Sequence, residues 1–258
     1  MANPLRHFLR NTVLDAFDKL YLSMDQRLAR RSAQVKRIPS LANRTGGKLA
    51  YGDWAHTIGV FQTLLFQYKP GDSAALHILD VGCGSGLLGI SSLPFVTAGG
   101  TYTGLDVDAQ LIDFCRKHYA QSGYNFLHLN AHNAMYAQHQ QQETVSWPVQ
   151  DASVDLVTAL SVWTHFREND ARFYLREVSR VLKPGGRALI TFFVLDEGYQ
   201  QSLSRRTDAV SVHHGTKATR WIFDQPAYGS AHWFCPKWVT VPEDAIGVTS
   251  EGLNALLE

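Results

Sequence analysis

Apolar residues recur every three to four positions at the start of the chain, which predicts an amphipathic helix. This stripe consists of Leu5, Leu9, Val13, Ala16, Leu20, Met24 and Leu28. A linker that contains Gly and Pro follows, and a second helical pattern covers residues 53–68. We expect residues 1–70 to form a helical lid or substrate segment.

From there on, short apolar runs alternate with helical spacing. The runs predict strands at residues 76–81, 101–106, 125–129, 154–160 and 187–195. Helices are predicted at 87–93, at 108–121 with Asp108 as its cap, and from Asn169 to a Lys-Pro-Gly-Gly turn at 183–186. Strands separated by helices indicate βαβ units. We therefore expect an α/β fold whose core, residues 71–195, is a Rossmann-like, doubly wound, mainly parallel sheet flanked by helices.

The composition of the chain indicates a globular protein without a membrane span. The 258 residues are 45% hydrophobic and 18% charged, which is typical of one enlarged globular domain. No run approaches the roughly 18 apolar residues of a membrane span, and Arg6, Arg10 and Asp15 interrupt the stretch where a signal peptide needs an apolar core. A cytoplasmic protein is expected. Three cysteines without CxxC spacing predict reduced thiols and no zinc site.

Charge is distributed unevenly along the chain. Residues 1–50 contain ten Lys or Arg and three Asp, a balance of +7, whereas the remaining residues contain 14 basic and 20 acidic groups, a balance of −6. We interpret the basic segment as a helix packed on the main domain with solvated arginines. A surface for RNA, for a peripheral membrane contact with anionic lipid or for an acidic partner is the alternative. The oligomeric state is not predicted.

A turn rich in glycine follows the first predicted strand, which ends near Asp80. Gly82, Gly84 and Gly86 form GxGxG, and Leu87 stands where a dinucleotide fingerprint requires its third glycine. Ligands of open parallel sheets bind beyond the carboxyl ends of the strands. The turn therefore favours a nucleoside with an amino-acid tail over NAD.

Two further strand ends carry side chains suited to a nucleoside. Asp106 stands 20 residues after Gly86, where its carboxylate can accept hydrogen bonds from both ribose hydroxyls. Because Asp108 already provides the helix cap, the ribose role is favoured for Asp106. Asn130 and Ala131 follow the third strand, where they can meet an adenine edge; Asn130 and His132 fit a turn equally well.

Five blocks of the sequence closely resemble the motif series of class I S-adenosylmethionine-dependent methyltransferases. They are HILDVGCGSGLLGI, YTGLDVD, HLNAHNAMY, WPVQDASVDLVTALSVWTHF and YLREVSRVLKPGGRALITFFVLDE. The resemblance as a whole covers about residues 50–200. The resemblance implies S-adenosylmethionine as cofactor and S-adenosylhomocysteine as product.

The same resemblance assigns roles to individual residues. It implies that Gly82, Gly84 and Gly86 contact the methionine part, Asp106 the ribose, Asn130 and Ala131 the adenine, and Ser161 the region of the sulfonium, with Asp80, Cys83 and Val107 completing the cofactor site. Asn130 departs from the family, which commonly has Asp there. An amide oxygen can still accept from the adenine amino group.

The fourth strand ends in ALSVWTHF and lacks the (D/N)PP(Y/F) of families that methylate planar amines. The resemblance therefore implies a small-molecule acceptor such as a sugar, lipid, quinone or secondary metabolite, with oxygen as the expected methyl acceptor. Nucleic acid is not expected as a partner. An RNA methyltransferase that uses the basic segment, and a cofactor-binding scaffold without catalysis, are the alternatives.

His165 is the predicted catalytic residue, because it follows the fourth strand and its ordinary pKa suits a general base. A loop histidine bonded to backbone is the alternative interpretation. Aromatic and polar side chains flanking the sheet are predicted to bind the acceptor, with core packing as their alternative role: Tyr51, Trp54, His56, Trp163 and Trp221. His213-His214 lacks a metal-ligand pattern, so no metal is expected.

Residues 196–258 are interpreted as a substrate or lid segment that ends in a helix from residue 242. The resembled family completes a sheet of order 3-2-1-4-5-7-6 with two C-terminal antiparallel strands, and no residues remain here to form them. We expect a truncated or incompletely observed chain in which these strands are missing. The fifth strand would then be an edge strand unless residues 209–240 cover it.

Overall fold

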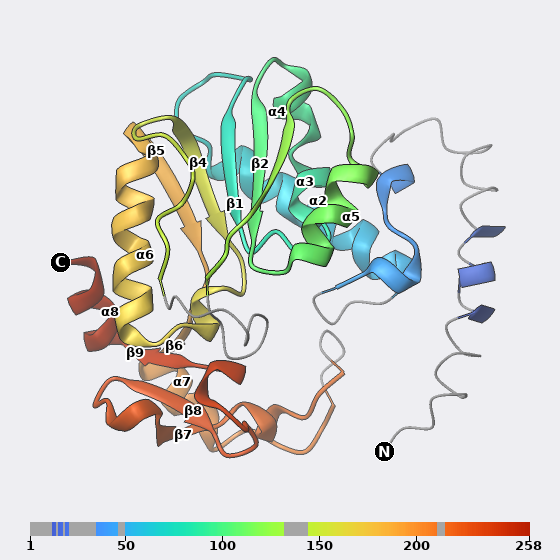
Figure 1. Cartoon of the computed structure of the whole chain (residues 1–258). Helices are drawn as coiled ribbons and strands as arrows, with labels where there is room; N and C mark the ends of the chain where they lie inside the picture. Colours follow the sequence, from blue (N-terminus) through green and yellow to red (C-terminus); the bar gives the residue numbers. More distant parts are fainter. Residues whose placement is uncertain are drawn as a thin grey trace. The chain divides into compact units, whose positions relative to one another are not determined.

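The computed structural model describes residues 12–13, 15–17, 19–20, 35–45, 50–131, 144–210 and 215–258. The chain divides into two compact units, Met1–Leu127 and His128–Glu258. Five strands form a sheet of order β3-β2-β1-β4-β5 (Figure 1). The strand order reverses after β1, which confirms the predicted doubly wound α/β fold.

The first unit contains β1 (His77–Val81), β2 (Thr101–Asp106) and β3 (Tyr124–His128). β1 and β2 pair in parallel, with His77 opposite Thr101 and Val81 opposite Leu105. All residues of β1 after His77 are buried. Such burial on both faces is typical of a parallel strand covered by helices, and it explains the continuous apolar run in the sequence.

Helices and short 3-10 turns surround these strands. They are η1 (Val35–Arg37), η2 (Leu41–Asn43), α2 (Tyr51–Tyr68), α3 (Leu87–Ser91), α4 (Leu93–Thr97) and α5 (Ala109–His118). The predicted cap of α5 is confirmed, because Asp108 Oδ1 accepts from the amides of Gln110 and Leu111 at 2.8 and 3.1 Å. The Ser91 hydroxyl donates to the Ile58 carbonyl at 3.1 Å and so links α3 to α2.

The N-terminal segment is described only in part. Residues 12–13, 15–17 and 19–20 are helical, as predicted, and Lys19 pairs with Asp15 at 2.9 Å. Val13 and Leu20 of the apolar stripe are exposed. Leu5, Leu9, Met24 and Leu28 lie outside the described residues.

The second unit begins its regular structure with β4 (Val154–Ala159), α6 (Glu168–Val181) and β5 (Leu182–Ile190). β4 and β5 are parallel, with Leu156 opposite Arg187 and Ala159 opposite Ile190. The register shifts between Val154 and Leu156, so residues 183–186 bulge out of the pairing. The Lys-Pro-Gly-Gly segment therefore lies inside β5, not before it as predicted.

A second sheet, which the sequence pattern did not predict, occupies the rest of this unit. It consists of β6 (Phe193–Leu195), β9 (Gly247–Thr249), β8 (Trp233–Pro236) and β7 (Phe223–Pro226), in that spatial order. β6 and β9 are parallel, and the other two pairs are antiparallel. Leu195, Phe223 and Ala245 form a small apolar cluster packed against Trp221 and Trp238.

Two predicted elements are corrected by this sheet. The strand predicted over 187–195 is divided, because the chain leaves β4 after the Thr191 amide bonds the Ala159 carbonyl and then pairs with β9. The helix predicted from residue 242 begins only at α8 (Ser250–Leu257), with Thr249 Oγ1 capping it by accepting from the Gly252 amide at 3.1 Å. Among the described residues, no additional antiparallel strands extend the five-stranded sheet.

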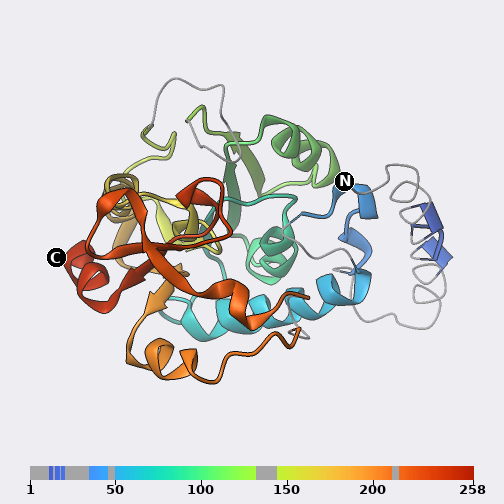
Figure 2. The ribbon, with the colours of Figure 1, turned by 90° about the horizontal axis from the view of Figure 1, so that it is seen from below.

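The remaining helical elements of this unit connect its strands. They are η3 (Trp163–His165), α7 (Glu197–Leu203), η4 (Ala218–Trp221), η5 (Ala227–Gly229) and η6 (Pro242–Asp244). Figures 1 and 2 show the C-terminal helix α8 beside α6, where Arg172 Nη1 donates to the Ala255 carbonyl at 3.0 Å. In the part of the chain that the structure describes, no helix is both long enough and apolar enough to cross a membrane.

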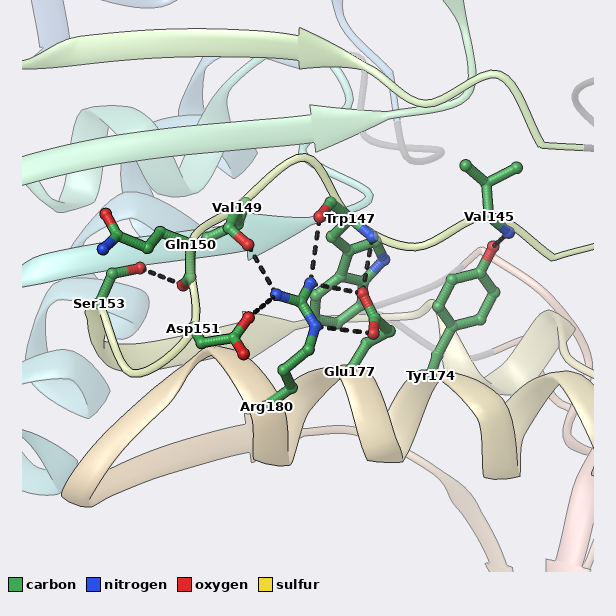
Figure 3. A network of polar contacts seen from close by, with 9 residues as sticks. All are labelled: Val145, Trp147, Val149, Gln150, Asp151, Ser153, Tyr174, Glu177 and Arg180. Atoms are coloured by element: carbon green, nitrogen blue, oxygen red, sulfur yellow. Dashed lines mark hydrogen bonds and ion pairs between the residues drawn. The ribbon is translucent and has the colours of Figure 1, made fainter.

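Arg180 on α6 holds the segment that leads into β4 (Figure 3). Its guanidinium donates to both carboxylate oxygens of Glu177, at 2.9 and 2.6 Å, and to the carbonyls of Val149 and Trp147, at 2.8 and 3.1 Å. It also contacts Asp151. The Trp147 amide donates to Glu177 at 2.6 Å, so both oxygens of the buried carboxylate accept hydrogen bonds.

We expect Arg180→Met to lower the free energy of unfolding by about 2 kcal/mol, because Glu177 keeps only the Trp147 amide as a donor and two carbonyls lose the guanidinium. Hydrogen bonds from Arg180 hold the pKa of Glu177 below its usual 4.5. The wild-type advantage should therefore be present above pH 4.5 and disappear as the pH falls through the lowered pKa. Urea unfolding at several pH values measures this. Arg176→Met, an exposed site on the same helix, should change stability by less than about 0.5 kcal/mol.

Candidate active site

Three alternating glycines form the turn between β1 and α3. Gly82, Gly84 and Gly86 have φ angles of 69°, 53° and 85°, which explains why this turn requires glycine. The amides of Gly82 and Cys83 both donate to the Leu105 carbonyl, at 2.7 and 3.1 Å. The turn is thus anchored on the end of β2.

Because glycine has no side chain, neighbouring protein groups pack closely against this turn. A Cβ atom at Gly86 would lie 2.4 Å from Cε2 of Tyr119, and one at Gly84 would lie 2.9 Å from Oγ1 of Thr45. The Tyr119 hydroxyl donates to the Ser85 carbonyl at 2.8 Å, which fixes its ring. Packing of the protein itself therefore requires two of these glycines, in addition to any approach of a ligand.

Gly86→Ala should destabilise the protein by about 1–2 kcal/mol more than Gly71→Ala. Both glycines have positive φ, but a Cβ at Gly71 meets nothing within 4 Å. The two variants share the left-handed strain, so their difference measures the clash with Tyr119. Thermal unfolding of both variants provides the comparison, and equal losses would mean that the Tyr119 ring moves aside at no cost.

Asp106 at the end of β2 is in direct contact with the glycine turn. Its Oδ2 accepts from the Gly84 amide at 2.8 Å, and its Oδ1 accepts from the Asp108 amide at 2.9 Å. Burial raises the pKa of Asp106 above its usual 3.8, and the backbone donors of Asp108 and Gly84 oppose this rise. A carboxylate has about four acceptor positions, so each oxygen that receives a backbone amide has the capacity to accept a ribose hydroxyl as well.

Thr45 reaches the same turn from the segment interpreted above as a linker. Its Oγ1 accepts from the Ser85 amide at 3.2 Å and bonds the Ser85 hydroxyl at 2.9 Å. The neighbouring Arg44 is buried and donates to the Pro39 carbonyl at 2.9 Å. Sequence reasoning missed Thr45, because a threonine in a polar linker has no periodic or motif signal.

Asp80 and Cys83 are packed inside the first unit. Asp80 is 4% exposed and accepts from the Tyr102 hydroxyl at 2.6 Å. A contact with Cys115, together with burial, raises the pKa of Cys83 well above its usual 9.0, so the thiol is protonated. The structure thus gives both residues partners within the protein, and their cofactor role stays a prediction.

The other predicted site residues of the first unit differ in exposure. Val107 follows Asp106 directly and is half-buried. Tyr51 is buried, and its hydroxyl donates to the Val35 carbonyl at 3.0 Å. Trp54 is 1% exposed and belongs to the core, whereas His56 is exposed. Trp54 therefore has the core-packing role that was the alternative to acceptor binding.

The second unit contains the residues predicted near adenine and sulfonium. Asn130 is exposed and Ala131 is buried, while His132 lies outside the described residues. Ser161 has a φ of 59°, an uncommon conformation for a residue other than glycine. Its amide donates to Thr191 Oγ1 at 2.7 Å, which holds this turn at the end of β4.

His165 is held in one protonation form by the backbone. Its Nδ1 lies 2.7 Å from the Glu243 carbonyl oxygen. Because a carbonyl only accepts, Nδ1 carries the proton and the basic lone pair of the neutral ring is on Nε2. Burial lowers the pKa of His165 below its usual 6.5, opposed by the Glu243 carbonyl and by Asp244. The alternative interpretation of His165, a loop histidine bonded to backbone, is thus present in the structure. The bond involves Nδ1, whereas a general base would act through Nε2.

Two tryptophans predicted to bind the acceptor take part in packing. Trp163 is fully buried, and its Nε1 donates to the Ala171 carbonyl at 3.3 Å. Trp221 is half-buried, with its ring 5.4 Å from Phe193 and 5.8 Å from Trp238. An acceptor-binding role for either tryptophan stays a prediction.

A metal site was not expected. His213 and His214 lie outside the described residues. Over residues that are described, no group of three or more His, Cys, Asp or Glu side chains is arranged to hold a metal ion.

Comparison with known proteins identifies the core. Residues 79–190 match a family model described as "Methyltransferase domain". An O-methyltransferase of Pyrenophora dematioidea is 35% identical over 126 residues, which is 49% of this chain and 42% of that protein. A fatty-acid O-methyltransferase of Mycolicibacterium smegmatis is 32% identical over 120 residues, which is 46% of this chain and 38% of that protein.

A crystal structure of a protein from Pyrococcus horikoshii is 18% identical, covers 79% of both chains and has a TM-score of 0.49. The match to this chain spans about two fifths of the length of the two relatives named above. The matched segment includes the glycine turn, Asp106 and His165. Residues 79–190 thus match a methyltransferase domain, in agreement with the resemblance to class I S-adenosylmethionine-dependent methyltransferases seen in the sequence.

Proposed function

We propose that the protein transfers a methyl group from S-adenosylmethionine to an oxygen of a small-molecule acceptor. The observation that carries this proposal is the hydrogen bond between the Gly84 amide and the Asp106 carboxylate. It joins the glycine turn to the acidic strand end within one compact unit, which is the arrangement that a ribose with an amino-acid tail requires.

The residues present suit this cofactor. Backbone groups of Gly82, Gly84 and Gly86 would hold its methionine part, and Asp106 would accept from the ribose hydroxyls. Asn130 and Ala131 are assigned to the adenine, and Ser161 to the neighbourhood of the sulfonium. When bound, S-adenosylmethionine supplies an electrophilic methyl group for in-line displacement, a reaction that depends strongly on alignment.

His165 is assigned the role of general base. Its ring is neutral at pH 7, because burial lowers its pKa, and the Nδ1 proton is held by the Glu243 carbonyl. Nε2 can therefore take the proton that an acceptor hydroxyl loses as its oxygen is methylated. Its half-buried position also limits competition from water.

The names of the relatives support oxygen as the acceptor atom. A carboxylate acceptor is already ionised at neutral pH and needs no base, whereas a hydroxyl acceptor does. The tautomer of His165 therefore favours a hydroxyl. We further propose that residues 1–70 and 196–258 contribute the acceptor-binding segments around the core at 71–195.

The experiment combines purified protein with methyl-labelled S-adenosylmethionine and a panel of probes. The panel contains a fatty acid, a catechol, a hydroquinone, a sugar and total tRNA, and mass spectrometry searches for products heavier by one methyl. Methylation of a hydroxyl probe supports the proposal. Methylation of tRNA alone, with strong salt dependence, would identify an RNA methyltransferase. Binding of S-adenosylhomocysteine without any product, in the panel and in a cell extract, would indicate a scaffold.

A further inference from the structure

A buried carboxylate in the second unit accepts hydrogen bonds from two side chains of different segments. Glu243, on η6, has a side chain that is 4% exposed. Tyr228 Oη lies 2.6 and 2.5 Å from its two oxygens and shares its single proton between them, and Arg167 Nε donates to Oε1 at 2.7 Å. The Arg167 guanidinium also lies over the Tyr228 ring, 4.7 Å from its centre. We call Tyr228, Glu243 and Arg167 the clamp.

The clamp acts on the segment that follows β4. The carbonyl of Glu243 accepts from His165 Nδ1 at 2.7 Å, and the Ile246 amide donates to the Thr164 carbonyl, also at 2.7 Å. Arg167 stands two residues after His165, so one residue, Glu243, holds this segment by its carbonyl and by its side chain. The next strand, β9, pairs with β6 and β8 and thereby fixes the position of η6.

Tyr228 contacts Glu243 from a strained backbone conformation. It has a φ of 54° and a ψ of 27°, in the left-handed region that bulky residues rarely adopt. The residue is 56% exposed, so core packing does not explain this conformation. The hydrogen bond that its hydroxyl shares between the two oxygens of Glu243, and the stacked Arg167, are the contacts that hold it. Such local strain is characteristic of functional sites.

Glu243 stays ionised in this environment. Burial alone would raise its pKa, but the donors Tyr228 and Arg167 outweigh burial and lower it below the usual 4.5. A charged carboxylate binds both donors more strongly than a neutral one. At neutral pH the clamp therefore contains a charged carboxylate, and the same residue presents its carbonyl to His165.

We propose that Glu243 is a positioning residue for His165, and that the clamp fixes the tautomer in which Nδ1 carries the proton and Nε2 faces the reaction as a base. The proposal rests on the function proposed above, in which His165 is the base. It assigns a role to the second sheet, because η5 and η6, which connect its strands, contribute Tyr228 and Glu243.

The experiment measures the His165 tautomer directly by nitrogen NMR on the full chain, labelled at histidine and assigned with His165→Asn. Wild-type protein should show Nδ1–H as the dominant tautomer. Tyr228→Phe and Glu243→Gln should lose this dominance and populate the Nε2–H form. Tyr199→Phe is the matched control, since Tyr199 lies in the same unit and also has an arginine over its ring, Arg206 at 4.8 Å. It should retain the wild-type spectrum.

Turnover supplies the second measurement. Tyr228→Phe and Glu243→Gln should lower kcat by roughly 10- to 100-fold, the range seen when the partner that orients a metal-bound imidazole is removed. The KM for S-adenosylmethionine should change by less than about twofold. A tautomer that is unchanged in both variants would overturn the proposal, whatever the activity. If the tautomer shifts but His165→Asn remains fully active, the positioning holds and the base role of His165 fails.

Discussion

Asp106→Ala will weaken the binding of S-adenosylhomocysteine by about 30- to 900-fold, or roughly 2–4 kcal/mol. The substitution removes the carboxylate expected to accept from the ribose hydroxyls. It also removes the acceptor that holds the Gly84 amide at 2.8 Å, so the glycine turn loses an anchor. Isothermal titration calorimetry with S-adenosylhomocysteine measures the effect.

Two further variants make this test specific. Asp106→Asn keeps one acceptor oxygen and should show an intermediate loss of affinity. Asp113→Ala removes an exposed carboxylate of α5 that pairs with Arg116 at 3.4 Å, and it should leave binding unchanged. If Asp106→Ala binds as tightly as wild type, the ribose assignment is wrong. NAD should not bind, because Leu87 replaces the third glycine of the dinucleotide fingerprint.

His165→Asn is expected to lower kcat by about 100- to 10,000-fold, the usual contribution of a general base, with S-adenosylhomocysteine affinity unchanged within about twofold. The assay uses whichever hydroxyl probe the panel identifies. The loss should shrink at high pH, where the acceptor ionises unaided. In wild-type protein, burial lowers the pKa of His165 below 6.5. Activity should therefore persist at pH 6.5 and fall only as the pH drops through that lowered pKa.

The matched control is His232→Asn. His232 is an exposed histidine of the same unit that also bonds through Nδ1, to Thr249 Oγ1 at 3.1 Å, and its replacement should leave kcat unchanged. A loss below about fivefold in His165→Asn would mean that alignment alone drives the reaction. If cofactor affinity collapses as well, His165 belongs to the pocket wall, and His56, Asp196 and Glu197 become the candidates for the base.

Local features of the fold were predictable because their causes are local. The β1 strand is a continuous apolar run, since both of its faces are buried. Asp108 caps α5 through amides two and three residues further on. The glycine turn and Asp106 belong to the same βαβ unit, whose geometry is similar in all open parallel sheets, so their contact followed from spacing.

Features that depend on distant pairing were not predictable. The strands of the second sheet have only three or four residues, too few for a period to emerge from the pattern. The bulge at residues 183–186 reads as a plain turn, because its place inside β5 depends on the register with β4. Thr45 lies 40 residues before the Ser85 that it contacts.

The sequence by itself determined the α/β core, the position of the glycine turn, the acidic strand end and the presence of a histidine after β4. Only the tertiary structure decided the chemical state of that histidine. The carbonyl that selects its tautomer belongs to Glu243, 78 residues away, and burial by surrounding elements lowers its pKa. Both effects arise from groups that meet only when the second sheet forms, and no local pattern encodes such a meeting.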